Sequence, residues 1–242
     1  MDHAAEEMRT FWDDRARENA AWYVDTTCDY DHPDMDAFFA VGRKVVAEAF
    51  VDAPVRPPGN RLAVEIGPGL GRISLALAEH FERVIGIDIS AEMVERARGL
   101  VTNPAVSFEV GNGTDLRPLE SGRVDFVTTF TVLQHLPSPE LIDGYLRDAA
   151  RVLAPGGILA AQWNNLPHPS AWRARAIWWR LRNRIGGPLK MDARVARPFI
   201  GTRLPLDVVT RTLEDAGMTI RATKGLGTLF AWVWAEKTGP VG

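Results

Sequence analysis

Residues 62–71 read Leu-Ala-Val-Glu-Ile-Gly-Pro-Gly-Leu-Gly, and this stretch decides the fold. Its first five residues form a short apolar run with Val and Ile, which is typical of a buried parallel strand. Three glycines follow at alternate positions, and the apolar run that begins at Ile73 starts a helix. Because glycine accepts positive φ and has no Cβ, its backbone can approach a ligand closely. A strand, a glycine-rich turn and a helix N-terminus together predict a nucleotide-binding element.

Predicted strands and helices alternate along the chain after this turn. The expected strands are 62–66, 83–88, 106–110, 124–130 and 158–163, and the helices between them are 71–80, one capped by Ser90, and 141–153. This alternation implies parallel strands with right-handed crossovers. A helix over 206–216 and strands near 218–224 and 228–236 close the chain, and the short link at 225–227 requires an antiparallel hairpin. The expected fold class is therefore α/β, with a mixed sheet and helices on both faces.

The remaining segments are expected to elaborate one domain that spans residues 1–242. Residues 1–53 carry two helical patterns, over 4–22 and after an N-cap at Asp34, and form a helical arm over the ligand cleft. The expected parts of the domain are this arm, a cofactor-binding core over 60–163, a basic, Trp-rich lid insertion over 164–204, and the final helix and hairpin over 205–236.

Composition favours an ordinary globular protein without covalent crosslinks. The chain has 242 residues, 46% of them hydrophobic and 24% charged, with a net charge of −3. Cys28 is the only cysteine, which excludes an internal disulfide framework and a thiolate metal cage. No uninterrupted apolar run is long enough for a spanning helix, and the acidic N-terminal region lacks a signal-peptide pattern. We therefore expect a cytoplasmic location.

Charge is unevenly distributed along the sequence. Residues 1–60 hold 13 acidic and 6 basic side chains, whereas residues 170–203 hold nine Lys or Arg and one Asp. A basic segment of this kind is compatible with nucleic acid or an anionic membrane surface. However, the region after the fourth strand lacks the Asn/Asp-Pro-Pro-aromatic loop of enzymes that modify the amino groups of nucleic-acid bases. The chain also has no Pro-Cys nucleophile, which enzymes that modify base carbon atoms use. No nucleic-acid partner is therefore expected.

The spacing of the glycines bears on which nucleotide the turn holds. A dinucleotide-binding turn reads G-x-G-x-x-G, whereas the glycines here are Gly67, Gly69 and Gly71. Glu65 lies two residues before the first glycine. Its carboxylate does not favour binding of a diphosphate, but it suits a ligand that carries an ammonium and a sulfonium. Asp88 ends the second strand, 21 residues beyond Gly67, where its carboxylate can accept hydrogen bonds from ribose hydroxyls. A sulfonium cofactor is therefore favoured over a nicotinamide dinucleotide.

Five short motifs, in order and at fitting intervals, give the chain a resemblance to the class I S-adenosylmethionine-dependent methyltransferases. They are Glu65–Gly71, Ile87–Ser90, Gly111–Gly113, Phe126–Phe130 and Arg151–Gly157. The resemblance covers about residues 60–165 and returns over 205–236. It implies a Rossmann-like sheet of seven strands in the order 3-2-1-4-5-7-6, with the last strand antiparallel, and S-adenosylmethionine as cofactor.

The resemblance also implies roles for individual residues. The glycines at 67, 69 and 71 would line the methionine and ribose portion of the cofactor, and Glu65 would hold its amino group. Asp88 would take the ribose diol, and Ile89 and Met93 would lie against the adenine. Asn112 stands beside Gly113 where the family often has aspartate; its side-chain carbonyl or Asp115 would meet the adenine amino group. Phe130 would lie near the reactive methyl group.

Two histidines are candidate general bases, because an imidazole can take a proton from a hydroxyl nucleophile near neutral pH. His135 follows the fourth strand, where the cleft of such a sheet opens, and His168 follows the fifth. Each can instead be a loop histidine bonded to backbone. Asn164 and Asn165 are candidate Mg²⁺ ligands, but no aspartate follows the fourth strand to complete such a site. A catalytic metal is therefore not favoured.

Indole and guanidinium groups in and before the insertion are candidates for acceptor binding. Indole faces suit sugars or aromatic substrates, and guanidinium suits carboxylate or phosphate. The candidates are Trp163, Trp172, Arg175 and Trp179.

The sequence therefore predicts a methyltransferase that acts on oxygen in a small or medium-sized hydroxylated acceptor, such as a sugar, a glycoside or a secondary metabolite. The reaction would be a direct S_N2 transfer with a histidine base. Three alternatives stay open at this point: methylation of nitrogen in a small molecule, a nicotinamide-dependent oxidoreductase, and a protein that binds S-adenosylmethionine without catalysis.

Overall fold

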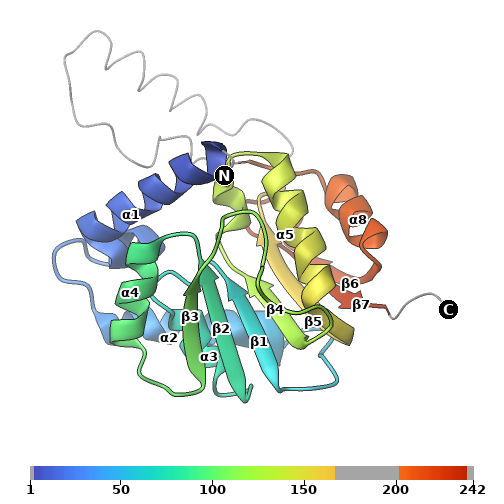
Figure 1. The fold of residues 1–242 in the computed structure, drawn as a ribbon, viewed down its shortest axis with the longest axis horizontal. Coiled ribbons are helices and arrows are strands. Elements are labelled where there is room, and N and C mark those ends of the chain that lie inside the picture. Colours follow the sequence, from blue (N-terminus) through green and yellow to red (C-terminus); the bar gives the residue numbers. More distant parts are fainter. Residues whose placement is uncertain (1–2, 167–201, 239–242) are drawn as a thin grey trace, which may run out of the picture.

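A computed structural model describes residues 3–166 and 202–238, which are built around one twisted sheet (Figure 1). Its strands are β1 (Leu62–Ile66), β2 (Arg83–Asp88), β3 (Val106–Val110), β4 (Val124–Thr129), β5 (Leu153–Trp163), β6 (Met218–Lys224) and β7 (Ala231–Lys237). Their order is β3-β2-β1-β4-β5-β7-β6. β1 to β5 pair in parallel, and β7 runs antiparallel to both of its neighbours. The predicted order and the antiparallel last strand are confirmed.

The described residues also form helices and helical turns, three of which begin at side-chain caps. They are α1 (His3–Val24), α2 (Met35–Val46), the π-helical turn η1 (Ala47–Val51), α3 (Arg72–Leu77), α4 (Ala91–Leu100), the 3₁₀ turn η2 (Leu133–His135), α5 (Pro139–Val152) and α8 (Leu206–Asp215). Asp34, Ser90 and Ser138 each accept a hydrogen bond from a backbone N–H in the first turn of α2, α4 and α5. Such caps satisfy donors that the helix itself leaves unpaired.

Apolar side chains cover both faces of the sheet. On one face, alternate residues of the central strands, such as Val64 and Ile85, pack with α5 and α8 in one buried cluster. On the other face, the neighbouring residues, such as Ala63 and Val84, pack with α2, η1 and α3. In Figure 1, α5 lies in front of the strands, whereas α2 and α3 lie behind them. The central strands are thus buried on both faces, as their uninterrupted apolar runs predict.

Helix α1 crosses from one of these faces to the other. Its beginning, at Ala5 and Met8, belongs to the cluster that contains α5. Its end, at Ala16 and Ala20, packs with Phe38 of α2 and with α4. α1 is also tied to the end of β2, because Asp13 accepts a hydrogen bond from Ser90. The helix therefore passes over the carboxyl end of the parallel strands, while α2 packs on the sheet as part of its cover.

Several elements differ in length from their predicted bounds: β7 begins at Ala231 rather than near residue 228, and ends of β4, α1, α5 and α8 shift by one or two residues. β5 begins at Leu153 rather than near residue 158, because Leu153 already pairs with Val124 of β4. A register shift in this pairing accommodates the Ala-Pro-Gly-Gly stretch over 154–157, which the sequence suggested as a break before the strand. α3 ends at Leu77 instead of residue 80. Of the predicted insertion over 164–204, only residues 164–166 and 202–204 lie in the described ranges.

Candidate cofactor and acceptor site

A cavity of about 510 Å³ opens at the carboxyl ends of β1, β2 and β4, with α1 across it. This is the position where open α/β sheets bind their ligands. Most of its walls come from the ends of the three strands, the turn after β1, the start of α4, the η2 turn and α1 with the residues that follow it, and Val41 of α2, Tyr145 of α5 and Phe230 also line it. The predicted residues that line it are Glu65, Gly67, Gly69, Asp88, Ile89, Met93, Phe130 and His135.

The turn after β1 brings its backbone to the wall of the cavity. Gly67 and Gly69 have φ values of 69° and 54°, a region that other residues seldom adopt. A Cβ on Gly67 would lie 2.3 Å from Val132, and a Cβ on Gly69 would lie 2.7 Å from Val24. The turn is therefore confined between the segment after β4 and the segment after α1, and only glycine fits at either position.

Glu65 places a carboxyl group inside the cavity. Its side chain is 2% exposed, and one of its oxygens accepts a hydrogen bond from Ser74 Oγ of α3. Burial raises the pKa of Glu65 to about 7 from its usual value near 4.5, although the Ser74 hydroxyl and the Arg72 guanidinium oppose this shift. A ligand ammonium beside it would favour the ionised form. A buried carboxyl group with few partners thus fits a cationic group better than a phosphate.

Asp88 closes the opposite side of the glycine turn. Its Oδ2 accepts a hydrogen bond from Gly69 N at 3.1 Å, and its Oδ1 accepts one from Ser90 N at 2.9 Å. Burial raises the pKa of Asp88, while these backbone donors act in the other direction. Each carboxylate oxygen can accept more than one hydrogen bond. Asp88 is therefore fixed by the backbone and can still receive the hydroxyls of a ribose.

Three further predicted residues give apolar contact in the cavity. Ile89 and Met93 are 8% and 2% exposed, and Met93 also packs with Phe38 and Leu70. Phe130 stacks on Trp232, with ring centroids 5.9 Å apart. All three line the cavity. Gly71 does not, because a Cβ there would meet the ring of Phe108 at 2.5 Å; this glycine packs α3 against β3 instead.

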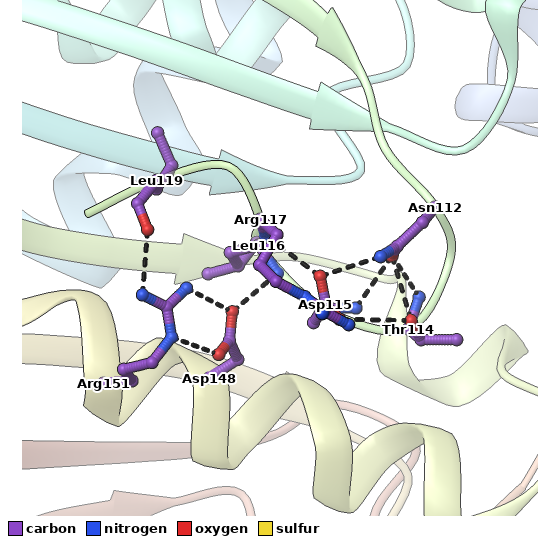
Figure 2. Close-up of polar contacts among 8 residues, drawn as sticks. All are labelled: Asn112, Thr114, Asp115, Leu116, Arg117, Leu119, Asp148 and Arg151. Carbon is purple, nitrogen blue, oxygen red and sulfur yellow. Dashed lines mark hydrogen bonds and ion pairs between the residues drawn. The ribbon is translucent and has the colours of Figure 1, made fainter. Parts of the chain in front are cut away.

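The loop after β3 uses its polar groups internally (Figure 2). Asn112 Oδ1 accepts hydrogen bonds from the backbone N–H groups of Thr114 and Asp115, and Asn112 Nδ2 donates to Asp115 Oδ1. Asp115 also pairs with Arg117, whose hydrogen bonds hold the pKa of that carboxyl down to about 2. Neither Asn112 nor Asp115 lines the cavity. Gly113 does not line it either, but a Cβ there would meet Ile89 at 2.4 Å.

A buried ion pair joins the glycine turn to the segment after α1. Arg72, directly after Gly71, is 4% exposed, and its Nη1 lies 2.5 Å from Asp25 Oδ2. The guanidinium also lies over the ring of Phe38, 4.9 Å from its centroid. Asp25, Thr26 and Arg72 all line the cavity. Removal of one partner of a buried pair leaves an uncompensated charge, so this contact fixes the arm over the glycine turn.

His135 lines the cavity from the η2 turn after β4. Its ring meets that of Trp12 of α1 edge to face, with centroids 5.5 Å apart. Its Nε2 lies 3.3 Å from Nε2 of Gln134. Gln134 Oε1 is buried and has no hydrogen-bond partner within the described part of the chain. His135 and Gln134 therefore line the same cavity as Glu65 and Asp88.

The structure places the other acceptor-side candidates away from this cavity or does not describe them. Trp163 is 1% exposed and donates its indole N–H to Leu204 O, so it belongs to the core. His168, Trp172, Arg175 and Trp179 lie outside the described residues. Within residues 3–166 and 202–238, no group of three or more His, Cys, Asp or Glu side chains could hold a metal ion. No helix in the same ranges has the length and apolar character needed to cross a membrane.

The comparison with protein families agrees with the cavity. Residues 64–161 match the family described as a methyltransferase domain, and solved structures of S-adenosylmethionine-dependent methyltransferases share the fold. The chain contains a methyltransferase domain with the fold of the class I S-adenosylmethionine-dependent methyltransferases. The methyltransferase domain begins in β1 and ends in β5, so it includes the glycine turn and Asp88. The predicted choice of S-adenosylmethionine over a nicotinamide cofactor is confirmed.

Individual relatives extend the match beyond the methyltransferase domain. An uncharacterised 37.1 kDa protein in a transposon of Streptomyces fradiae is 44% identical over 182 residues, 68% of this chain and 50% of that protein. The ubiquinone biosynthesis O-methyltransferase of Xanthomonas oryzae is 35% identical over 112 residues, 46% of this chain and 45% of that enzyme. The chain thus spans about half the length of the curated relatives it matches.

Geranyl diphosphate C-methyltransferase from Streptomyces coelicolor A3(2) is a structural neighbour over the whole chain. The two superpose with a TM-score of 0.61 at 15% identity, over 98% of each chain. At this level of identity the likeness concerns the fold. The acceptor must therefore be inferred from the cavity itself.

Several residues of the site were not predicted from the sequence. Trp12 and Tyr23 line the cavity from α1, and Arg72, Asp25 and Gln134 add further polar groups to it. The position of Arg72 next to Gly71 is a signal that sequence reasoning could have used. Trp12 gave none, because its helical spacing is also that of an ordinary packed face.

Proposed function

We propose that this protein transfers a methyl group from S-adenosylmethionine to an oxygen atom of a small or medium-sized hydroxylated acceptor, with His135 as general base. The observation that carries the proposal is that His135 lines the same cavity as Glu65 and Asp88. The likeness to an enzyme named as an O-methyltransferase supports it over part of the chain. Sugars, glycosides and secondary metabolites are the proposed acceptor classes.

The cofactor supplies an electrophilic methyl group on a sulfonium, and the protein supplies alignment and exclusion of water. Glu65 and Asp88 are carboxyl groups at opposite sides of the glycine turn, suited to the ammonium and to the ribose hydroxyls. Ile89, Met93 and Phe130 line the cavity with apolar groups, which suit the remaining parts of the donor. These residues bind and orient the donor, and none of them needs to transfer a proton.

Proton transfer distinguishes the acceptor. An alcohol or phenol oxygen must lose its proton as the O–C bond forms and the S–C bond breaks, and the His135 imidazole accepts that proton. A neutral amine needs no base before it attacks, so a histidine at this position helps oxygen more than nitrogen. Gln134 lines the cavity beside His135, and its side-chain amide can form a hydrogen bond with a second hydroxyl of a polyhydroxylated acceptor.

Replacement of His135 tests the base directly. Incubation with methyl-labelled S-adenosylmethionine and fractionated lysate first identifies an acceptor, and a panel of phenols, glycosides and amines then defines its class. With that acceptor, His135→Ala should lower kcat by about 10²–10⁴-fold, which is the usual contribution of a general base. The affinity for S-adenosylhomocysteine should change less than about twofold.

His32→Ala is the matched control, because His32 is exposed and does not line the cavity. It should leave both quantities unchanged. An unchanged kcat in His135→Ala would show that His135 is not the general base. If only amines become labelled, nitrogen rather than oxygen is the methylated atom. If no fraction gives a labelled product, the protein binds the cofactor without catalysis.

A further inference from the structure

Thr131 has an unusual backbone conformation at the wall of the cavity. It follows β4 by two residues and lines the cavity together with Phe130 and Val132. Its φ is 56°, and within the described residues no other non-glycine residue has a positive φ. For a β-branched residue the left-handed region is costly, and such strain persists only where the surroundings enforce it.

Gln162 of β5 supplies the hydrogen bond that holds this conformation. Its side-chain Oε1 accepts from Thr131 N at 3.0 Å, and because a backbone N–H can only donate, this contact fixes the orientation of the amide. Gln162 is 2% exposed, and the four residues before it are Ile158, Leu159, Ala160 and Ala161. A polar side chain buried at the end of an apolar run is costly unless it is hydrogen-bonded.

The turn at Thr131 determines what faces the glycine turn. β1 and β4 are neighbours in the sheet, with Ile66 opposite Thr129, so the segments that follow them leave the sheet side by side. Val132 lies against Gly67, where a Cβ would be 2.3 Å away. Three residues beyond Val132 the chain reaches His135. The left-handed turn thus forms the wall between the cofactor turn and the acceptor side.

We infer that Gln162 is a positioning residue that holds Thr131 in its left-handed conformation and so fixes the wall of the cavity where the donor methyl group meets the acceptor. The inference rests on the proposed function, because it assigns this wall to the place of methyl transfer. Gln162 itself does not line the cavity and acts only through Thr131.

A purely structural role for Gln162 makes a different prediction. If the amide serves only to satisfy a buried N–H, its loss lowers stability, and nothing at position 131 corrects ligand binding. If the amide enforces a strained φ, glycine at 131 makes the enforcement unnecessary, because glycine adopts positive φ without strain. Rescue by Thr131→Gly therefore separates the two roles.

The test compares wild type with Gln162→Leu, Thr131→Gly and the double variant. Calorimetry measures the Kd of S-adenosylmethionine and of S-adenosylhomocysteine, which differ only in the methyl group and its charge, and Tm reports folding. Gln162→Leu should raise the Kd of S-adenosylmethionine about tenfold and the Kd of S-adenosylhomocysteine less than about threefold. Loss of a single hydrogen bond costs roughly this much in affinity. The double variant should return the first Kd to within about threefold of wild type.

Folded Gln162→Leu protein in which both affinities are unchanged, or fall equally, would overturn the inference, and so would a double variant no better than Gln162→Leu. If Gln162→Leu does not fold, the double variant is compared with Thr131→Gly. The inference then requires the double variant to fold and to bind S-adenosylmethionine as well as Thr131→Gly does. A double variant that does not fold, or that binds more weakly, would assign Gln162 to the core alone. No acceptor enters this experiment, so its outcome is independent of whether oxygen is the methylated atom.

Discussion

Glu65 is a carboxyl group that folding removes almost completely from water. Its side chain is 2% exposed, and this burial raises its pKa to about 7. In an unfolded chain the same group titrates near 4.5. Below pH 7 the folded protein therefore holds a proton that the unfolded chain has already released over much of this range. This difference links the binding site to the stability of the protein.

The first prediction follows from the sign of this difference. Since the folded state binds more protons between about pH 4.5 and 7, the contribution of Glu65 to the free energy of unfolding falls as pH rises through that window. The total loss is about 3 kcal/mol, because one pKa unit corresponds to about 1.4 kcal/mol. Glu65→Gln cannot titrate and should lack this loss. Urea denaturation of both proteins from pH 4.5 to 8 measures it, and a constant difference between them would contradict a buried, protonated Glu65.

At the scale of elements, helix α1 is fastened across the cavity by polar contacts with the core. Asp13 Oδ1 accepts hydrogen bonds from Ser90 Oγ at 2.6 Å and from Glu92 N at 3.2 Å, so it adds a second cap to the start of α4. Arg9 donates to Gly111 O at 3.3 Å. α1 also contributes Met8 and Trp12 to the cavity. The contacts that hold the helix in place therefore also complete the site.

Asp13→Ala should lower both stability and cofactor affinity. Loss of a cap costs about 0.5–2 kcal/mol, and a loosened α1 no longer covers the cavity. We expect weaker binding of S-adenosylhomocysteine by calorimetry and faster proteolysis within α1. Asp14→Ala is the matched control, since Asp14 is the adjacent residue, lies exposed and pairs only with Arg17 among the described contacts. Equal behaviour of the two variants would show that Asp13 does not anchor the helix.

At the scale of the whole molecule, most of the fold could be predicted because its parallel strands are buried on both faces. Such strands appear in the sequence as short apolar runs, and β1, β2 and β3 have the predicted bounds. β5 is longer than predicted because strand pairing with Val124 continues through a stretch whose proline and glycines suggest a turn. Pairing between distant segments is not visible in a local pattern.

The site could be predicted only where the chemistry is local. Glu65, Asp88 and the glycines lie at fixed distances from a strand end, and the cavity brings most of them together. Asn112 is turned into its own loop, since a neighbouring turn competes for its side chain. Gln162 gave no signal of its own, because its role depends on the conformation of Thr131 in the loop that follows β4.

Ligand binding should stabilise the whole described fold, because the cavity joins α1, β1, β2, β4 and η2. At a concentration of S-adenosylhomocysteine 100 times its Kd, the gain is about 2.7 kcal/mol. For a chain of this size that corresponds to a rise in Tm of roughly 5–10 °C. Thermal denaturation with and without the ligand checks this. Glu65→Gln should show a smaller rise, and an equal rise would indicate that the ligand does not meet Glu65.

Calorimetric titration of the wild-type protein and of Asp88→Asn tests the cofactor assignment most directly. Wild type should bind one S-adenosylhomocysteine per chain and give no binding heat with NADH. Asp88→Asn should lower the affinity for S-adenosylhomocysteine by about tenfold or more, because charge-assisted hydrogen bonds to the ribose hydroxyls are lost. Asp207→Asn, an exposed aspartate on α8, should bind like wild type. Binding of NADH without binding of S-adenosylhomocysteine would contradict the assignment.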